Sequence, residues 1–272
     1  MATCETLNLG YNNFGVEGIT SLANSEHLGN LRTLVCWDSE FGDEGLDVIG
    51  SAPGFPSLRS LGCGYNQLSP AGVRHLFSGP VGRQLTSVAL HSSQFASGTG
   101  FPVGSLNDVP LRHLHMNFCD LSPEGLRELM ESEAFPDLRS LSLKRNEIRG
   151  GFASIFSRPR PIRKVDASRN GIDDDVVDEA LAKGHADHLE WLDLSENQVT
   201  DRGARALSVN PQLAKLEVLH LTGNQITDDG SRHLRESSVL QNLKLLYLSG
   251  AMLSEVERER LVQRFGEGVI IR

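Results

Sequence analysis

The sequence predicts an α/β solenoid of about ten strand–helix units, with a parallel sheet on its concave face and helices on its convex face. Two observations predict it. A frame of the form LxxLxLxxN recurs along the whole chain at nearly constant spacing, and most copies are followed by residues that begin helices. One such unit cannot bury its hydrophobic face alone, so neighbouring units must stack into a continuous core.

The clearest copy of the frame begins at Leu189 and reads LEWLDLSENQV. Strong copies also begin at Leu138 and Leu216, and a partial copy opens the chain at Cys4. Weaker copies begin at Leu31, Leu58, Leu85, Leu111, Ile162 and Leu243. The fourth frame position falls at residues 7, 34, 61, 88, 114, 141, 165, 192, 219 and 246, so the spacing is 27 residues except for one step of 26 and one of 24. Ten units at such regular spacing are not a chance pattern.

The first part of each unit is a strand. The fourth and sixth positions alternate as a strand requires, so both side chains point into the core. Asparagine at the ninth position ends the strand, because its amide can bond backbone groups that the turn leaves unpaired. Stacked copies predict an asparagine ladder, in which Ser39, Ser93 and Cys119 replace the asparagine of three repeats.

The second part of most units is a helix. Ser69 and Ser122 each precede a proline, and Thr200 and Thr227 each precede an aspartate, as helix N-caps do. A glycine three residues after each cap is expected to let the helix start lie close to the strand layer; these glycines are Gly72, Gly125, Gly203 and Gly230. Strands stack about 4.8 Å apart and helices about 8–10 Å, so the helices take the outer arc.

The frame and its period resemble the ribonuclease-inhibitor-like subclass of leucine-rich-repeat proteins over essentially the whole chain. The segment from Leu192 to Asn197 and the ending from Leu261 to Gly266 are among the residues that carry the resemblance. The resemblance implies a right-handed α/β horseshoe that binds proteins. It does not imply that the bound protein is a ribonuclease. Cysteine is sparse here, whereas mammalian members are rich in it, and the repeats look like those of bacterial members.

We expect a single domain over residues 1–272, with 254–272 as a C-terminal capping segment. Ser254 and Glu257 are spaced as a capping box, and residues 269–271 favour a last strand. We expect no N-terminal cap, which favours a longer native protein or self-association through the first repeat. Residues 96–104 are rich in glycine and proline and are expected to be extended or 3₁₀, and the sixth repeat is shortened.

The composition narrows the function classes. The chain has 272 residues, of which 39% are hydrophobic and 22% charged, so it can bury a core. A net charge of -9 disfavours nonspecific binding of nucleic acid and of anionic membranes. The sequence shows neither an apolar run long enough for a membrane span nor a secretory signal, and its four scattered cysteines favour a reducing cytoplasm.

No catalytic signature is present, so we predict neither an enzyme nor a bound cofactor. The run from Asp173 to Asp175 lacks the spacing of a calcium loop and is expected to be a solvated helix start. Cys36 and Cys63 occupy the same inward position on neighbouring strands; a disulfide is conceivable, but reduced core residues are the preferred interpretation. His91, His113 and His115 are expected on the concave face, as partner contacts or, alternatively, as zinc ligands.

The concave face is the candidate site. Frame positions three, five and seven point outward from the strand, and position eight lies near its end. Both tryptophans and all three tyrosines of the chain fall on these positions, although aromatic side chains also simply favour strands. The candidate partner-binding residues are Tyr11, Trp37, Tyr65, His91, His113, His115, Phe118, Lys144, Arg145, Trp191 and Tyr247. Their neighbours on this face include Lys164, Asp166, Arg169, Asp193, Glu196 and His220.

Three functions are open at this point. The first is a cytoplasmic scaffold that binds a protein partner with its concave face, where aromatic and arginine side chains suit a binding hot spot. The second is a regulator such as a GTPase activator, which some ribonuclease-inhibitor-like proteins are. The third is the sensor fragment of a larger multidomain protein. Fold alone does not decide between them.

Overall fold

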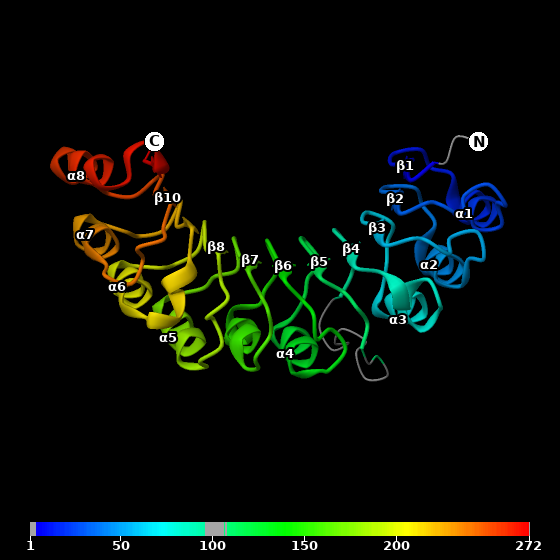
Figure 1. The fold of residues 1–272 in the computed structure, drawn as a ribbon, viewed down its shortest axis with the longest axis horizontal. Coiled ribbons are helices and arrows are strands. Elements are labelled where there is room, and N and C mark those ends of the chain that lie inside the picture. Colours follow the sequence, from blue (N-terminus) through cyan, green and yellow to red (C-terminus); the bar gives the residue numbers. More distant parts are fainter. Residues whose placement is uncertain (1–3, 96–105, 107, 272) are drawn as a thin grey trace. The chain divides into compact units, whose positions relative to one another are not determined.

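The computed structural model describes residues 4–95, 106 and 108–271. It comprises two compact units, Met1–Leu138 and Arg139–Arg272, which we call unit 1 and unit 2 and describe separately. In both units the repeats supply short parallel strands, and most strands are followed by a helix (Figure 1). The α/β repeat architecture expected from the sequence is therefore confirmed. The segment 96–104, expected to be extended or 3₁₀, lies outside the described residues.

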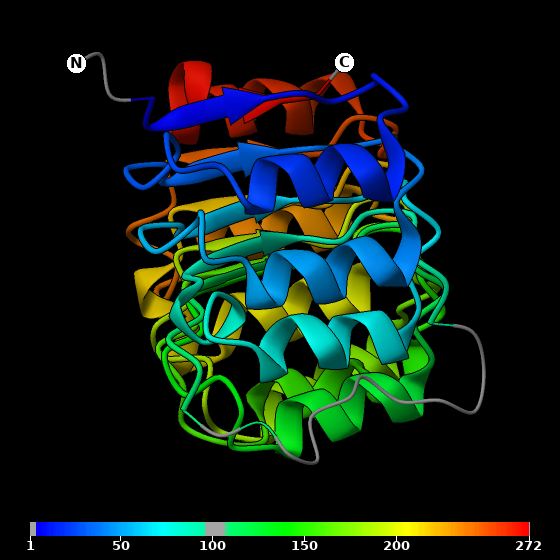
Figure 2. The ribbon, with the colours of Figure 1, turned by 90° about the vertical axis from the view of Figure 1, so that its right-hand side faces the viewer.

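The described residues of unit 1 form five parallel strands in chain order. They are β1 (Thr6–Asn8), β2 (Thr33–Val35), β3 (Ser60–Gly62), β4 (Ser87–Ala89) and β5 (His113–His115). The helices are α1 (Gly15–Ala23), α2 (Gly42–Ser51), α3 (Pro70–Ser78), η1 (Gly82–Gln84) and α4 (Pro123–Glu131). Figure 2 shows α1, α2 and α3 stacked on one side of the strand layer. Leu34 pairs in register with Leu7 on one side and Leu61 on the other, so the repeat frame is also the register of the sheet.

Unit 2 continues the same pattern. Its strands are β6 (Ser140–Ser142), β7 (Lys164–Asp166), β8 (Trp191–Asp193), β9 (Val218–His220), β10 (Leu245–Tyr247) and β11 (Val269–Ile270). Its helices are η2 (Arg149–Phe156), α5 (Asp174–Ala182), α6 (Asp201–Val209), η3 (Pro211–Lys215), α7 (Asp228–Glu236), α8 (Glu255–Phe265) and η4 (Gly266–Gly268). The shortened sixth repeat uses the 3₁₀ helix η2 in place of an α-helix. The last strand expected from the sequence is confirmed, because Val269 pairs with Leu246.

The inward positions of the strands form the core, as the frame predicts: Leu34, Leu61 and Val88 are buried. Phenylalanine adds a part of the core that the frame does not assign. Among the described residues of unit 1, five phenylalanine side chains are almost fully buried: Phe41, Phe55, Phe77, Phe95 and Phe135. The rings of Phe77 and Phe135 lie 5.5 Å apart, so these large side chains fill the space between repeats.

The cysteines at the inward sixth position are reduced. Cys36 and Cys63 are buried and free, and their thiols donate to the carbonyl oxygens of Gly62 (3.5 Å) and Ala89 (3.6 Å). Burial raises the pKa of Cys36 to about 12 and the pKa of Cys63 well above its usual value. The disulfide alternative is therefore wrong, and the prediction of reduced core thiols is confirmed.

The asparagine ladder is present. The Asn66 amide donates to the carbonyl oxygens of Cys36 (2.8 Å) and Cys63 (2.9 Å), while its oxygen accepts from the backbone N–H of Ser39 (2.8 Å). One side chain thereby joins two repeats. Where the asparagine is replaced, a donor remains: Ser93 Oγ and Cys119 Sγ both donate to the Leu90 carbonyl oxygen.

A second ladder joins the helix starts. The Asp174 carboxylate accepts from the backbone N–H (2.8 Å) and the hydroxyl (2.5 Å) of Thr200, the N-cap of the next repeat. Asp201 receives the same two bonds from Thr227, and Asp43 from Ser69. These contacts tie α3, α6 and α7 each to the helix before it.

This ladder corrects two expectations from the sequence. A Cβ at Gly203 would lie 2.4 Å from Asp174 Oδ1, so the glycine makes room for the carboxylate of the preceding repeat and not for the strand layer. A Cβ added at Gly72 or Gly230 would likewise collide with a carboxylate oxygen of the preceding repeat, that of Asp43 or Asp201. The acidic run is also not simply a solvated helix start, because Asp174 is only 6% exposed.

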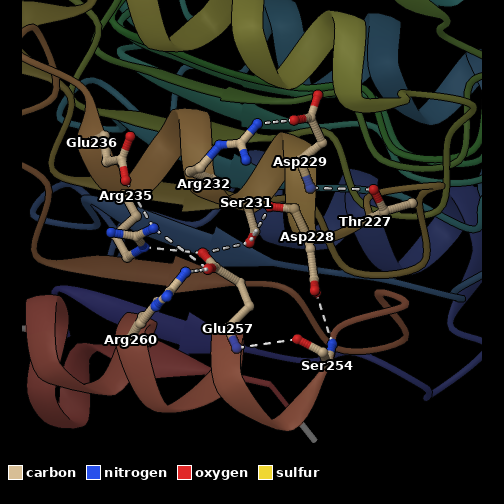
Figure 3. Close-up of polar contacts among 10 residues, drawn as sticks. All are labelled: Thr227, Asp228, Asp229, Ser231, Arg232, Arg235, Glu236, Ser254, Glu257 and Arg260. Carbon is tan, nitrogen blue, oxygen red and sulfur yellow. Dashed lines mark hydrogen bonds and ion pairs between the residues drawn. The ribbon is translucent and has the colours of Figure 1, made fainter.

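The C-terminal segment is held by a buried acid (Figure 3). Ser254 caps α8 by accepting from the backbone N–H of Glu257 (3.2 Å). The Glu257 carboxylate does not complete the capping box. It accepts instead from Ser231 Oγ (3.0 Å) and Arg235 Nε (3.0 Å), and it is 3% exposed.

Within the described parts of the chain, none of the helices has the length and apolar character of a membrane span.

Candidate functional site

The strand face of each unit is the side of its strand layer away from the helices. Frame positions four and six are buried against the helices, so positions three, five and seven project from the strand face. Side chains at one frame position on neighbouring repeats are in register and lie about 4.8 Å apart at their Cα atoms. Rows of related side chains can therefore touch across several repeats.

In unit 1 three rings touch in a chain, which we call the aromatic cluster. The Trp37 and His91 ring centroids lie 5.9 Å apart at 85°, and those of His91 and His115 lie 6.0 Å apart at 72°. Both are edge-to-face arrangements, which aromatic rings favour. The sequence predicts these residues on one face, and the structure brings them into contact.

Two glycines make the aromatic cluster possible. Gly64 holds position seven between Trp37 and His91, and a Cβ there would lie 2.6 Å from the His91 carbonyl oxygen. A Cβ at Gly62 would lie 2.5 Å from Trp37 Nε1, so the indole rests directly on this glycine. The Trp37 ring therefore occupies the space above Gly62.

Trp37 is a packing residue as well as a surface residue. It is half-buried, and its Nε1 atom is buried without a hydrogen-bond partner among the described residues. A buried unpaired N–H costs free energy. Close contact with Gly62 and His91 offsets this cost, so we expect Trp37 to contribute to stability as well as to the surface.

Two features favour the neutral form of His91. Its Nδ1 accepts a hydrogen bond from the backbone N–H of Asn117 (3.3 Å), and burial lowers its pKa. The neutral ring then carries its proton on Nε2. Zinc was the alternative for these histidines. Within the residues that the structure describes, no three His, Cys, Asp or Glu side chains converge as a metal site would require.

The eighth frame position is a turn residue, which the sequence did not predict. In all ten repeats its φ angle is positive, from 48° at Asp38 to 82° at Gly250. Four candidate binding residues occupy this position: Tyr11, Tyr65, Phe118 and Arg145. Tyr11 and Tyr65 are 69% and 44% exposed. These side chains stand on the turn that ends the strand, at the margin of the strand face.

In unit 2 three further rings form what we call the aromatic row. Trp191 lies 5.0 Å from His220 at 50°, and His220 stacks on Tyr247 at 3.9 Å and 6°. Lys164 Nζ lies 4.1 Å from the centroid of the Trp191 ring. His220 belongs to this row although the sequence placed it only among the neighbours. The signal was available, because His220 and Tyr247 share frame position five on adjacent strands.

Charged groups surround the aromatic row. Asp166 and Asp193 are register partners on β7 and β8, and Asp193 is the register partner of His220. Burial lowers the pKa of His220, and Lys164 acts in the same direction, whereas Asp193 and Asp166 oppose the shift. Further along the same strand ends, Arg169 pairs with Glu196 at 2.7 Å. Lys144 is half-buried at position seven of the sixth repeat.

Four stretches of the chain, residues 5–23, 109–130, 185–208 and 212–234, match the family described as Leucine Rich repeat. No curated protein matches the chain. Among solved structures, the chain is similar to TLR13 in the crystal structure of its complex with ssRNA13, with a TM-score of 0.58 and 21% identity. That match covers 92% of this chain and 33% of the other, so the chain spans about a third of the length of TLR13.

The chain is also similar to InlP of Listeria monocytogenes, with a TM-score of 0.51 and 18% identity over 84% of this chain and 62% of that one. At these identities the likeness shows the fold alone. Together with the strand frame and the asparagine ladder, these matches identify the repeating unit of this chain as the leucine-rich repeat.

Proposed function

We propose that the protein is a non-catalytic scaffold that binds a protein partner with its strand faces. One observation carries the proposal. Half-exposed rings touch one another on the strand face, as the aromatic cluster in unit 1 and the aromatic row in unit 2. Such rings do not fill the core, which the inward positions supply. Aromatic side chains are enriched in binding hot spots, where they provide large contact areas at little conformational cost.

A protein partner is favoured over a nucleic acid. The net charge is -9, and Asp166 and Asp193 lie side by side on the strand face of unit 2. Phosphate groups would be repelled by both features. RNA is nevertheless the alternative to test, because TLR13, a protein of similar fold, was crystallised with ssRNA13.

We further propose that residues 1–272 act as one domain of the ribonuclease-inhibitor-like, bacterial type. A repeat length near 27 residues and an α-helix in most repeats support this subclass. A cytoplasmic location is supported by the four cysteines, all of them free in the structure, because disulfides are typical of oxidising compartments.

The test is a quantitative pull-down from native lysate with the full chain as bait. Trp37→Ala and Trp191→Ala each remove one ring from the strand face, and Val209→Ala is the control, because Val209 is 63% exposed on α6. Melting curves correct each bait for its folded fraction, and nuclease treatment separates RNA from protein. We expect a protein that the control retains and the ring variants lose. Equal capture by all three baits, or capture of RNA alone, would contradict the proposal.

A further inference from the structure

The strand face of unit 2 carries an unusual row at frame position five. In register across four strands the row holds Asp166, Asp193, His220 and Tyr247. The two carboxylates occupy neighbouring strands, with Cα atoms about 4.8 Å apart. Like charges placed directly opposite one another destabilise a sheet. A positive group between or above the two acids would therefore relieve their mutual repulsion.

Lys164 stands beside this row, but it does not pair directly with either acid. Among the residues that the structure describes, no ion pair includes Asp166 or Asp193. Lys164, on the same strand as Asp166, places its ammonium group 4.1 Å from the centre of the Trp191 ring. Arg169 is engaged with Glu196 at the strand ends.

Both carboxylates are nevertheless fixed in orientation. Asp193 Oδ1 accepts from the backbone N–H of Ser195 (2.7 Å), and Asp166 Oδ1 accepts from the N–H (3.1 Å) and hydroxyl (2.8 Å) of Ser168. Asp166 Oδ2 accepts from Ser142 Oγ at 3.3 Å. These bonds engage Oδ1 of both acids and also Oδ2 of Asp166, so both carboxylates are held in a set orientation. A ligand that pairs with pre-oriented carboxylates loses little conformational entropy.

We propose that this surface binds an arginine side chain of the partner protein, an inference that rests on the proposed function. A guanidinium group is planar, pairs with a carboxylate through two parallel hydrogen bonds, and also lies well against aromatic rings. Here the acids and the half-exposed rings of Trp191 and His220 stand beside one another. The contact between Lys164 and Trp191 shows that a ring of this row accepts a cation.

Lysine and acidic ligands fit this surface less well. An ammonium group is compact and strongly hydrated and cannot form the paired bonds of a guanidinium. An acidic side chain or a phosphate would add a third negative charge to the row. The lowered pKa of His220 keeps its ring neutral near pH 7, so the ring does not repel an incoming cation.

The test uses the full chain with Trp37→Phe, so that Trp191 is the single tryptophan and its fluorescence reports on the row. The probe is a short glycine peptide that carries two arginines, compared with matched peptides that carry two lysines or two glutamates. We expect saturable binding of the arginine peptide, and weaker binding of the lysine peptide by about threefold or more. Asp193→Asn should raise the Kd of the arginine peptide about tenfold. The control Asp178→Asn, on the exposed side of α5, should leave it unchanged.

Asp193→Asn should fold normally, since its amide oxygen still accepts from Ser195, and Asp166→Asn repeats the test from the second acid. Equal binding of the arginine peptide to Asp193→Asn and Asp178→Asn would overturn the proposal, as would equal affinity for all three peptides or no saturable binding. The pull-down separates this failure from failure of the proposed function. If Trp191→Ala loses the partner while Asp193→Asn retains it fully, the scaffold stands and the arginine site is wrong.

Discussion

Single polar side chains hold the turns of this chain together, and Asn197 is the strongest case. Its amide donates to the carbonyl oxygens of Ala167 (3.1 Å) and Leu194 (2.9 Å), and its oxygen accepts from the backbone N–H groups of Asn170 (2.9 Å) and Ile172 (3.0 Å). Asn197→Leu leaves three of these groups without their partner, whereas the Leu194 carbonyl oxygen keeps its bond from the Asn224 amide (2.8 Å). We expect a loss of about 3 kcal/mol or more in the free energy of unfolding, measured by urea denaturation.

Asn12 provides the matched control. It is exposed, and its amide donates to the carbonyl oxygens of Leu9 (2.9 Å) and Gly10 (2.9 Å), which water can replace. Asn12→Leu should therefore cost less than about 1 kcal/mol. Equal losses for the two variants would show that the ladder does not stabilise the chain as described.

Trp37 shows how a residue can serve both packing and binding. Trp37→Phe keeps a ring above Gly62 and removes the buried unpaired N–H, so stability should stay the same or rise by up to about 1 kcal/mol. Trp37→Ala removes the ring and should cost about 2 kcal/mol. Urea denaturation of both variants tests this. A loss with Trp37→Phe as large as with Trp37→Ala would mean that the N–H has a partner.

At the scale of elements, the strands were predictable and the contacts between helix starts were not. A constant period fixes which residues are neighbours across the sheet, so the register of Leu34 and Leu61 follows from counting alone. The bond between Asp174 and Thr200 does not, because it depends on how far a helix start reaches toward the preceding repeat. The aspartate and the glycine were visible as a recurring pair, but one sequence does not show that they belong to adjacent repeats.

The helix-start ladder gives a prediction at this scale. At Gly203 an added Cβ would lie 2.4 Å from Asp174 Oδ1 and 2.7 Å from Val199 Cγ1, so Gly203→Ala should push the helix start away and cost about 2 kcal/mol. Gly29 is the control, since an added Cβ would meet nothing within 4 Å and φ lies outside the left-handed region. Gly29→Ala should be neutral or slightly stabilising. Similar unfolding energies for the two alanine variants would contradict the ladder.

At the scale of the whole molecule, stability should depend on two histidines. Burial lowers the pKa of both His91 and His220 below the unfolded value of about 6.5. Just below that pH the unfolded chain binds more protons than the folded chain. The contribution of the two histidines to the free energy of unfolding is therefore fully present above about pH 6.5, and it falls as the pH decreases from there toward the lowered pKa values of the folded state. Urea denaturation at about pH 7.5 and about pH 5 measures the fall.

His91→Gln and His220→Gln should each reduce this fall, whereas His27→Gln, on an exposed loop, should not. Unfolding free energies that stay constant or rise toward pH 5 would contradict the assignment of two neutral histidines.

The candidate site was predictable as a face but not as a set of contacts. The frame places Trp37 and Trp191 on the strand face of their units, since no inward position is available to them. It could not show that Trp37 bridges to His91, because that contact depends on the missing side chains of Gly62 and Gly64. Nor could it show the left-handed turn that carries Tyr65.

The central claim is that the strand faces, and not the helix side, meet the partner. Site-specific photo-crosslinking in cells tests it most directly. A photoreactive phenylalanine analogue replaces Tyr65 or Tyr247 on the strand side, and Val209 or Val262, which are 63% and 52% exposed, on the helix side. We predict that the same partner protein crosslinks to positions 65 and 247 and to neither helix position. Crosslinks from positions 209 or 262 without any from 65 or 247 would contradict the claim.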